Sequence, residues 1–116
     1  MDNNLYKKSY VFAIRIVKSY QYISDEKREF ILSKQLLRSG TSIGANISEA
    51  NGAISKADFS AKLSISYKEC LETKYWLSLL KDTDFIDLKT FKSMHDDADE
   101  LAKILYTIIN KSRNRK

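Results

Sequence analysis

The chain has no proline and only three glycines, at positions 40, 44 and 52. Because proline interrupts helices and short-stranded folds need frequent turn formers, this scarcity favours long helices over a meander of strands. No segment approaches the roughly 20 apolar residues that a membrane-spanning helix needs. The first residues also lack an apolar stretch followed by a small-residue cleavage site. We therefore expect neither a membrane partner nor a signal peptide.

Cysteine and histidine occur once each, as Cys70 and His95. A lone cysteine cannot form an intramolecular disulfide and is typical of a reducing cytoplasm, where we expect this protein. A di-iron centre in a helical bundle needs a Glu-x-x-His pair on two helices, but the residue three positions before His95 is Lys92. A single-metal site on His95 with Asp96 or Asp99 would need ligands from other helices that the sequence does not place. We expect no metal or other cofactor, with His95 at a core edge or on the surface.

Residues for nucleophilic catalysis are equally scarce. Cys70 falls on an apolar line, where a buried thiol is usually inert. The serines show no His–carboxylate pairing, and no glycine-rich phosphate loop is present. The sequence therefore predicts a non-enzymatic protein.

What the chain does contain is amphipathic helical periodicity over most of its 116 residues, enough for one domain over residues 1–116. Apolar residues recur at helical spacing in four segments, at about 5–23, 26–51, 56–81 and 88–110. Short links join them. The economical arrangement is an all-α, antiparallel up-down-up-down four-helix bundle.

Start and stop signals set these predicted boundaries. Ser24 and Asp25 offer an N-cap for the second helix, and Asn51-Gly52 a stop in the left-handed conformation. Ser55 with Asp58 resembles a capping box, and Asp87 caps the last helix. The predicted inward or facing residues of the first two helices are Tyr6, Tyr10, Ala13, Val17 and Tyr20, flanked by Phe12, Ile16 and Ile23, then Phe30, Leu32, Leu36, Ile43 and Ile47.

Residues 35–50 carry two adjacent stripes. An apolar line of Leu36, Ile43, Ile47 and Ala50 runs beside a polar line of Gln35, Ser39, Ser42, Asn46 and Glu49. Between the lines lie Gly40, Gly44 and Ala45, which are small enough for another helix to approach closely. An ordered polar line beside a core face indicates that this helix specifies a partner helix.

Two motifs give the chain a family resemblance. They are Gln35-Leu36-x-Arg38-Ser39 with Ser42-Ile43 and Asn46-Ile47-x-Glu49, and then Asp58-Phe59, Lys62-Leu63-Ser64-Ile65, Lys68-Glu69 and Glu72-Thr73-x-Tyr75-Trp76-Leu77. Over nearly the whole chain the sequence resembles the bacterial four-helix-bundle family encoded in intervening sequences of large-subunit ribosomal RNA genes. Ala50 departs from the glycine usual in relatives, a change that a helix tolerates well.

The resemblance implies a four-helix bundle that assembles with itself into a cyclic homopentamer. A related branch, the accessory variability determinants of diversity-generating retroelements, forms basic pentamers that bind nucleic acid and a reverse transcriptase. The resemblance thus implies a reverse transcriptase partner only if one is encoded nearby. It brings no established activity, and the old ribosomal-protein label of the family is not a function.

The polar line yields a hypothesis about interfaces. We expect Arg38, Asn46 and Glu49 to meet polar groups of the third helix, within a subunit or across an interface, since buried polar groups must be paired. The predicted interface or seam residues are Gln35, Ser42, Asn46, Glu49, Glu69, Glu72, Tyr75 and Trp76. A simply solvated face is the alternative. The sequence has seven tyrosines, five phenylalanines and one tryptophan, and one bundle core cannot bury them all because Tyr67, Tyr75 and Trp76 lie on different sides of the third helix. This favours an oligomer, and partly exposed aromatics on a monomer are the alternative.

The net charge of +5 permits binding to RNA or DNA. Lys8, Arg15 and Lys18 form a basic stripe with Tyr22, which could stack on a base. The predicted phosphate-binding residues are Lys8, Arg15, Lys18, Arg38, Lys111, Arg113 and Arg115. In a ring, such weak contacts would add by avidity. The alternative is a protein-interaction scaffold without a nucleic-acid partner, whose charge serves only solubility.

Overall fold

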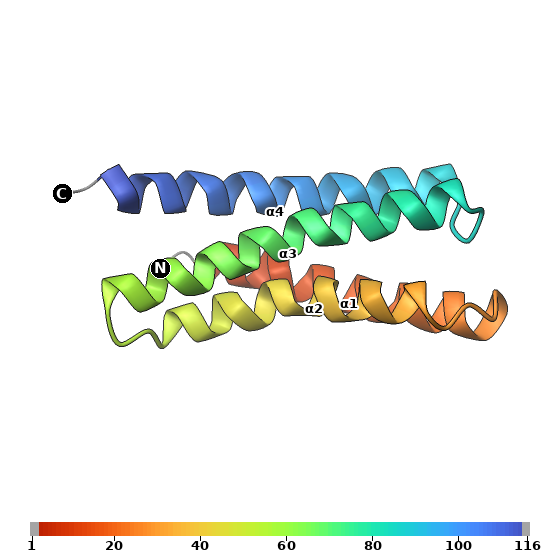
Figure 1. Ribbon diagram of the computed structural model, residues 1–116, viewed down its shortest axis with the longest axis horizontal. Coiled ribbons are helices and arrows are strands. Elements are labelled where there is room, and N and C mark those ends of the chain that lie inside the picture. Colours follow the sequence, from red (N-terminus) through yellow and green to blue (C-terminus); the bar gives the residue numbers. More distant parts are fainter. Residues whose placement is uncertain (1–2, 115–116) are drawn as a thin grey trace.

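The computed structural model describes residues 3–114, with side chains described for residues 4–112. It contains four helices, α1 (Asn3–Glu26), α2 (Leu32–Asn51), α3 (Lys56–Asp82) and α4 (Leu88–Asn114). Consecutive helices pack against each other and α1 closes the bundle against α4, so α1 and α3 are diagonal (Figure 1). The bundle measures 49 × 21 × 21 Å. The predicted all-α, up-down-up-down fold is confirmed.

The antiparallel arrangement gives the bundle two different ends (Figure 1). The start of α1, the α2–α3 loop and the end of α4 lie together at one end. The α1–α2 and α3–α4 loops lie at the other. Among the described residues, no helix is long and apolar enough to cross a membrane.

Among the described residues, the core is a column of mainly aliphatic side chains in which Phe12 of α1 is the one fully buried aromatic. Leu36, Ile43 and Ile47 of α2 are buried as predicted. The facing side of α1 is different from the predicted one, because Phe12, Ile16 and Ile23 fill the core whereas Tyr10 and Val17 are exposed. Phe30 is also exposed, since it lies in the loop before α2.

The boundary between the first two helices was predicted wrongly. Residues 24–26 continue α1, where the Ser24 hydroxyl donates to the Tyr20 carbonyl at 2.7 Å instead of capping α2. The chain then turns through Arg28, which has a positive φ of 56°. Glu29 caps the start of α2 from the preceding loop, because its carboxylate accepts the N–H groups of residues 31, 32 and 33 at 2.8–3.1 Å. The side chain thus satisfies amides that a helix start leaves without partners.

The remaining boundaries follow their predicted signals more closely. The Ser55 hydroxyl accepts the Asp58 N–H at 3.0 Å, and the Asp87 carboxylate accepts the Thr90 N–H at 2.7 Å. This second contact lowers the pKa of Asp87. Gly52 ends α2 as predicted, but with a φ of −101° rather than in the left-handed region.

Candidate nucleic-acid interface and polar seam

Arg38 is the centre of a polar seam between α2 and α3. Its guanidinium pairs with both Glu69, at 3.2 Å, and Glu72. Gln35 accepts from Arg38 Nε at 3.4 Å, and the indole N–H of Trp76 donates to Glu72 at 3.0 Å. Five residues predicted from sequence therefore meet within one chain, where a single cation lies between two carboxylates.

Further along the seam, hydroxyl groups make buried contacts that the sequence did not assign. Thr73 donates to Ser39 at 3.0 Å, and Ser66 donates to the Ile43 carbonyl at 2.8 Å. All three hydroxyl-bearing side chains are completely buried. Because every such group finds an acceptor, the contacts fix the register of α2 against α3 without leaving a polar atom unpaired.

In the C-terminal part of the polar line, Glu49 contacts another helix, whereas Ser42 and Asn46 form hydrogen bonds within α2. Glu49 pairs with Lys62 of α3 at 2.8 Å, a partner that the sequence hypothesis did not include. Asn46 donates to the Ser42 carbonyl of its own helix, and Ser42 donates to the Arg38 carbonyl. Tyr75 is exposed and lies edge-on against Trp76. Asn46, Ser42 and Tyr75 therefore form no hydrogen bond across the α2–α3 seam with a described residue.

The basic stripe of α1 faces the carboxylates of α4. Lys8 pairs with Glu100 at 3.2 Å, and Arg15 pairs with Asp97 while donating to Ser93 at 2.9 Å. Lys18, in contrast, is exposed and makes no ion pair with a described residue. Two of the three cations of the predicted α1 stripe, Lys8 and Arg15, therefore form ion pairs between α1 and α4.

Net positive charge gathers at one end of the bundle. We define the basic end as the described residues 3–10, 46–62 and 103–114, which adjoin in space (Figure 1). Its described side chains include six cations and two carboxylates: Lys7, Lys8, Lys56, Lys62, Lys103 and Lys111, against Glu49 and Asp58. Lys8 and Lys103 pair with Glu100 and Asp99, which lie just outside these ranges. The opposite end, residues 18–34 and 78–92, carries seven cations and six carboxylates: Lys18, Lys27, Arg28, Lys34, Lys81, Lys89 and Lys92, against Asp25, Glu26, Glu29, Asp82, Asp84 and Asp87.

Two predicted phosphate-binding residues lie partly or wholly outside the part of the chain that the structure describes. The side chain of Arg113 and all of Arg115 fall outside the described residues. Lys111 is described, is exposed and makes no ion pair with a described residue. The sequence did contain a signal for the basic end, because no Asp or Glu follows Glu100. In the predicted antiparallel bundle, that acid-free segment lies beside the start of the first helix and the link between the second and third.

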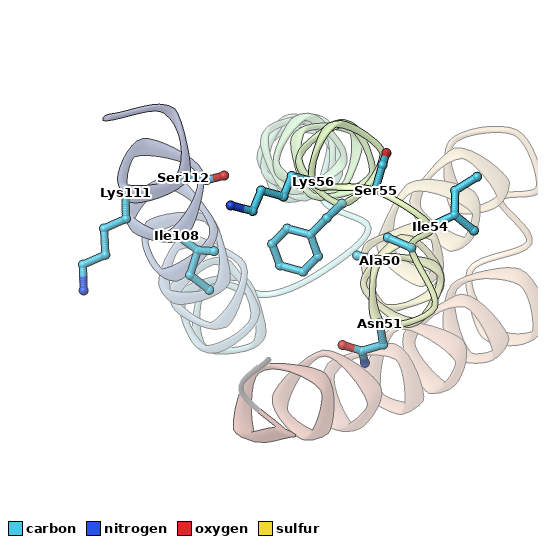
Figure 2. Close-up of a pocket in the computed structure, with 10 residues that line it drawn as sticks. Ala50, Asn51, Ile54, Ser55, Lys56, Ile108, Lys111 and Ser112 are labelled. Atoms are coloured by element: carbon cyan, nitrogen blue, oxygen red, sulfur yellow. The ribbon is translucent and has the colours of Figure 1, made fainter. Parts of the chain in front are cut away.

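A surface depression of about 660 Å³ opens at the basic end (Figure 2). The α2–α3 loop, the first turn of α3 and the last turns of α4 enclose it. Its lining residues include Phe59 and Ile108, together with Lys56, Lys111 and Ser112. No carboxylate is among them.

Comparisons with known proteins agree with this architecture. The model of the family described as 23S rRNA-intervening sequence protein matches residues 1–107. The chain belongs to this family. It is also similar to a protein from Bacteroides thetaiotaomicron VPI-5482, whose crystal structure is described as that of a protein of unknown function from the S23 ribosomal protein family. The two share 50% identity over 94% of this chain and 97% of the other, with a TM-score of 0.93. No curated protein matches the chain.

In this member of the 23S rRNA-intervening sequence protein family, the residues considered for catalysis or metal binding have structural contacts. Burial raises the pKa of the Cys70 thiol to about 12, which leaves it protonated at neutral pH. The His95 ring packs 5.0 Å from the ring of Phe91. Asp99 is held by Lys74 and Lys103 at 2.7 and 2.9 Å. Among the described residues, no three His, Cys, Asp or Glu side chains are grouped so as to hold a metal ion.

Proposed function

We propose that this chain is a non-enzymatic, homo-oligomeric protein that binds RNA or other nucleic acid through its basic end. The observation that carries the proposal is the charge difference between the ends, since six described cations share the basic end with two carboxylates, whereas seven cations share the opposite end with six. Lys7, Lys56 and Lys111 of the basic end make no ion pair with a described residue. Their charge is therefore available to phosphates without breaking an existing contact.

This proposal moves the main phosphate contacts away from the α1 stripe. Lys8, Arg15 and Arg38 are held by carboxylates of neighbouring helices. A phosphate would have to compete with those carboxylates, so we expect these three cations to contribute less. Lys111 and the basic residues that follow it keep their predicted role.

Self-assembly is supported by two exposed apolar faces on the diagonal helices. On α1, Tyr10, Val11, Ile14 and Val17 are exposed. On α3, Leu71 and Tyr75 are exposed one turn apart. A closed cyclic ring uses two different faces of each subunit in head-to-tail contact. Faces on opposite sides of the bundle fit this requirement, and the pentamer implied by the family resemblance stays our expectation for its size.

Oligomerisation would strengthen binding through the basic end. Rotation about a ring axis places the same end of every subunit at the same height along that axis. A polyanion lying across the ring can therefore contact several basic ends at once, and weak contacts add by avidity.

The test is a fluorescence-anisotropy titration with labelled structured RNA, single-stranded RNA and duplex DNA, at about 50 and 200 mM salt. The basic-end variant carries Lys7→Gln, Lys56→Gln and Lys111→Gln. Its matched control carries Lys27→Gln, Lys34→Gln and Lys89→Gln at the opposite end, which removes the same charge. We expect the first variant to weaken binding and flatten its salt dependence, and the control to retain most affinity.

Equal losses in both variants would show that total charge, rather than the basic end, governs binding. Absence of binding by the wild-type protein to all three probes at low salt would reject the nucleic-acid proposal. The exposed apolar faces would then favour the alternative, a protein-interaction scaffold without a nucleic-acid partner.

A further inference from the structure

The depression at the basic end combines an apolar surface with a cationic rim. Phe59 and Ile108 are partly buried, pack against the core and still line the depression. Their positions on α3 and α4 place them on facing sides of it, so that an aromatic ring and an aliphatic side chain are both accessible from the opening. Its volume of about 660 Å³ falls in the range, about 300–1,000 Å³, of sites that take small ligands.

The polar groups on the rim favour an anion. In Figure 2 the Lys56 side chain extends across the depression toward α4, and the Ser112 hydroxyl points toward the Lys56 amine. The Lys111 amine points away, on the outer side of α4. Neither lysine has an ion-pair partner among the described residues, and no acidic residue lines the depression. Lys56 is therefore the cation best placed to meet a ligand that enters.

We propose that this depression holds one unpaired nucleotide of a nucleic-acid strand, with its base against Phe59 and Ile108 and its phosphate at Lys56. The inference rests on the proposed function and adds to it a preference for unpaired nucleotides over base-paired ones. A base within a duplex is stacked on its neighbours and cannot enter, whereas an unpaired base presents a flat apolar face that aromatic side chains recognise. The protein should therefore bind single-stranded segments more tightly than blunt duplex.

The combination of Lys56 with the Phe59 ring favours a nucleotide over a purely apolar ligand. An apolar segment of a partner protein would cover Phe59 but would leave Lys56 unpaired and partly desolvated. A nucleotide satisfies both halves of the depression, because its base is flat and apolar on its faces and its phosphate carries the complementary charge. An acidic peptide would meet Lys56 but would gain little from the aromatic ring.

The test measures binding of an RNA strand of about 12 nucleotides and of the blunt duplex made from it. Phe59→Leu removes the aromatic face but keeps apolar contact with the core, Phe59→Trp keeps an aromatic face, and Tyr22→Leu removes an exposed aromatic at the opposite end. We expect Phe59→Leu to weaken single-strand binding roughly tenfold and to leave duplex binding unchanged. Phe59→Trp should retain the wild-type preference, Tyr22→Leu should have no effect, and Lys56→Gln should weaken both probes.

Several results would overturn the inference while leaving the proposed function intact. One is an unchanged single-strand affinity in Phe59→Leu with melting temperature preserved. Another is a loss of affinity in Phe59→Leu that is equal for the single strand and the duplex. A third is displacement of the single strand from the wild-type protein by poly-glutamate at matched charge concentration. If the wild-type protein binds neither probe, the proposed function itself fails, and the inference fails with it.

Discussion

Gly40 of α2 lies directly against Ile16 of α1. A Cβ atom built at position 40 would stand 2.6 Å from Ile16 Cγ1 and 2.8 Å from Ile16 Cγ2. Both atoms branch from the Cβ of a completely buried side chain, so they cannot swing away as the tip of a long side chain would. The missing methyl group at Gly40 therefore sets how closely α1 and α2 approach.

Gly40→Ala should lower the free energy of unfolding. Overpacking a core costs typically about 1–3 kcal/mol, which outweighs the gain of about 1 kcal/mol from replacing glycine in a helix. We expect a net loss of about 1 kcal/mol by chemical denaturation. Gly44→Ala is the matched control, because its Cβ would stand 3.1 Å from Ser9 Oγ, and its effect should be smaller. A larger loss at position 44 would contradict this account of the α1–α2 contact.

Arg38→Met should destabilise the bundle because it leaves Glu69 and Glu72 beside each other without their shared cation. The Glu69 side chain is only 15% exposed, so water replaces the lost contact poorly. We expect a loss of about 1 kcal/mol. Lys34→Met, at an exposed position without an ion-pair partner in the described chain, should change stability by less than about 0.5 kcal/mol. Adding Glu69→Gln to Arg38→Met should restore part of the loss, and a further loss would reject the explanation.

The Asp99 carboxylate should titrate well below its ordinary range. Hydrogen bonds from Lys74 and then Lys103 lower the pKa of Asp99 from 3.8 to about 2. Because this pKa is lower in the folded state, the stabilisation is present above pH 3.8 and is lost as the pH falls toward 2. Carboxyl-carbon NMR titration of wild type and Lys74→Met measures the shift directly. A pKa of Asp99 that does not rise in Lys74→Met would contradict the assignment.

The exposed face of α1 should contribute to the oligomer. Ile14→Asp places a charge in the middle of that face, so we expect a lower assembly mass by native mass spectrometry or sedimentation at equal protein concentration. Ile31→Asp is the control, since Ile31 is exposed in the α1–α2 loop. If Ile14→Asp retains the wild-type mass while Tyr75→Ser dissociates the assembly, the contact lies on α3 rather than α1. A monomeric wild-type protein would reject self-assembly.

The fold was predictable from sequence because its periodicity and several caps act locally. Helical spacing located all four helices, and Ser55 and Asp87 marked the starts of α3 and α4. The start of α2 was not predictable in the same way. Ser24 has the chemistry of an N-cap but donates within α1, and Glu29 caps through a carboxylate whose role depends on the turn at Arg28. Local residue preference could not distinguish these two arrangements.

The candidate site was less predictable because it depends on how helices are placed against each other. Arg38, beside the polar line of α2, pairs in the structure with Glu69 and Glu72, two carboxylates that helical spacing places on one stripe of α3. The basic stripe of α1 gave no sign that carboxylates of α4 would lie opposite it. The depression joins Lys56 to residues of α4 some 50 positions away in the chain. Only the antiparallel packing brings those segments together.

The most direct test of the basic-end proposal is a methyl NMR titration of isoleucine-labelled protein with single-stranded RNA. Isoleucine methyl groups report on both ends, with Ile54 and Ile108 at the basic end and Ile31 and Ile86 at the opposite end. We predict that Ile108 and Ile54 shift progressively with added RNA and that Ile31 and Ile86 do not. Shifts confined to Ile31 and Ile86, or to Ile14 on the α1 surface, would contradict binding through the basic end.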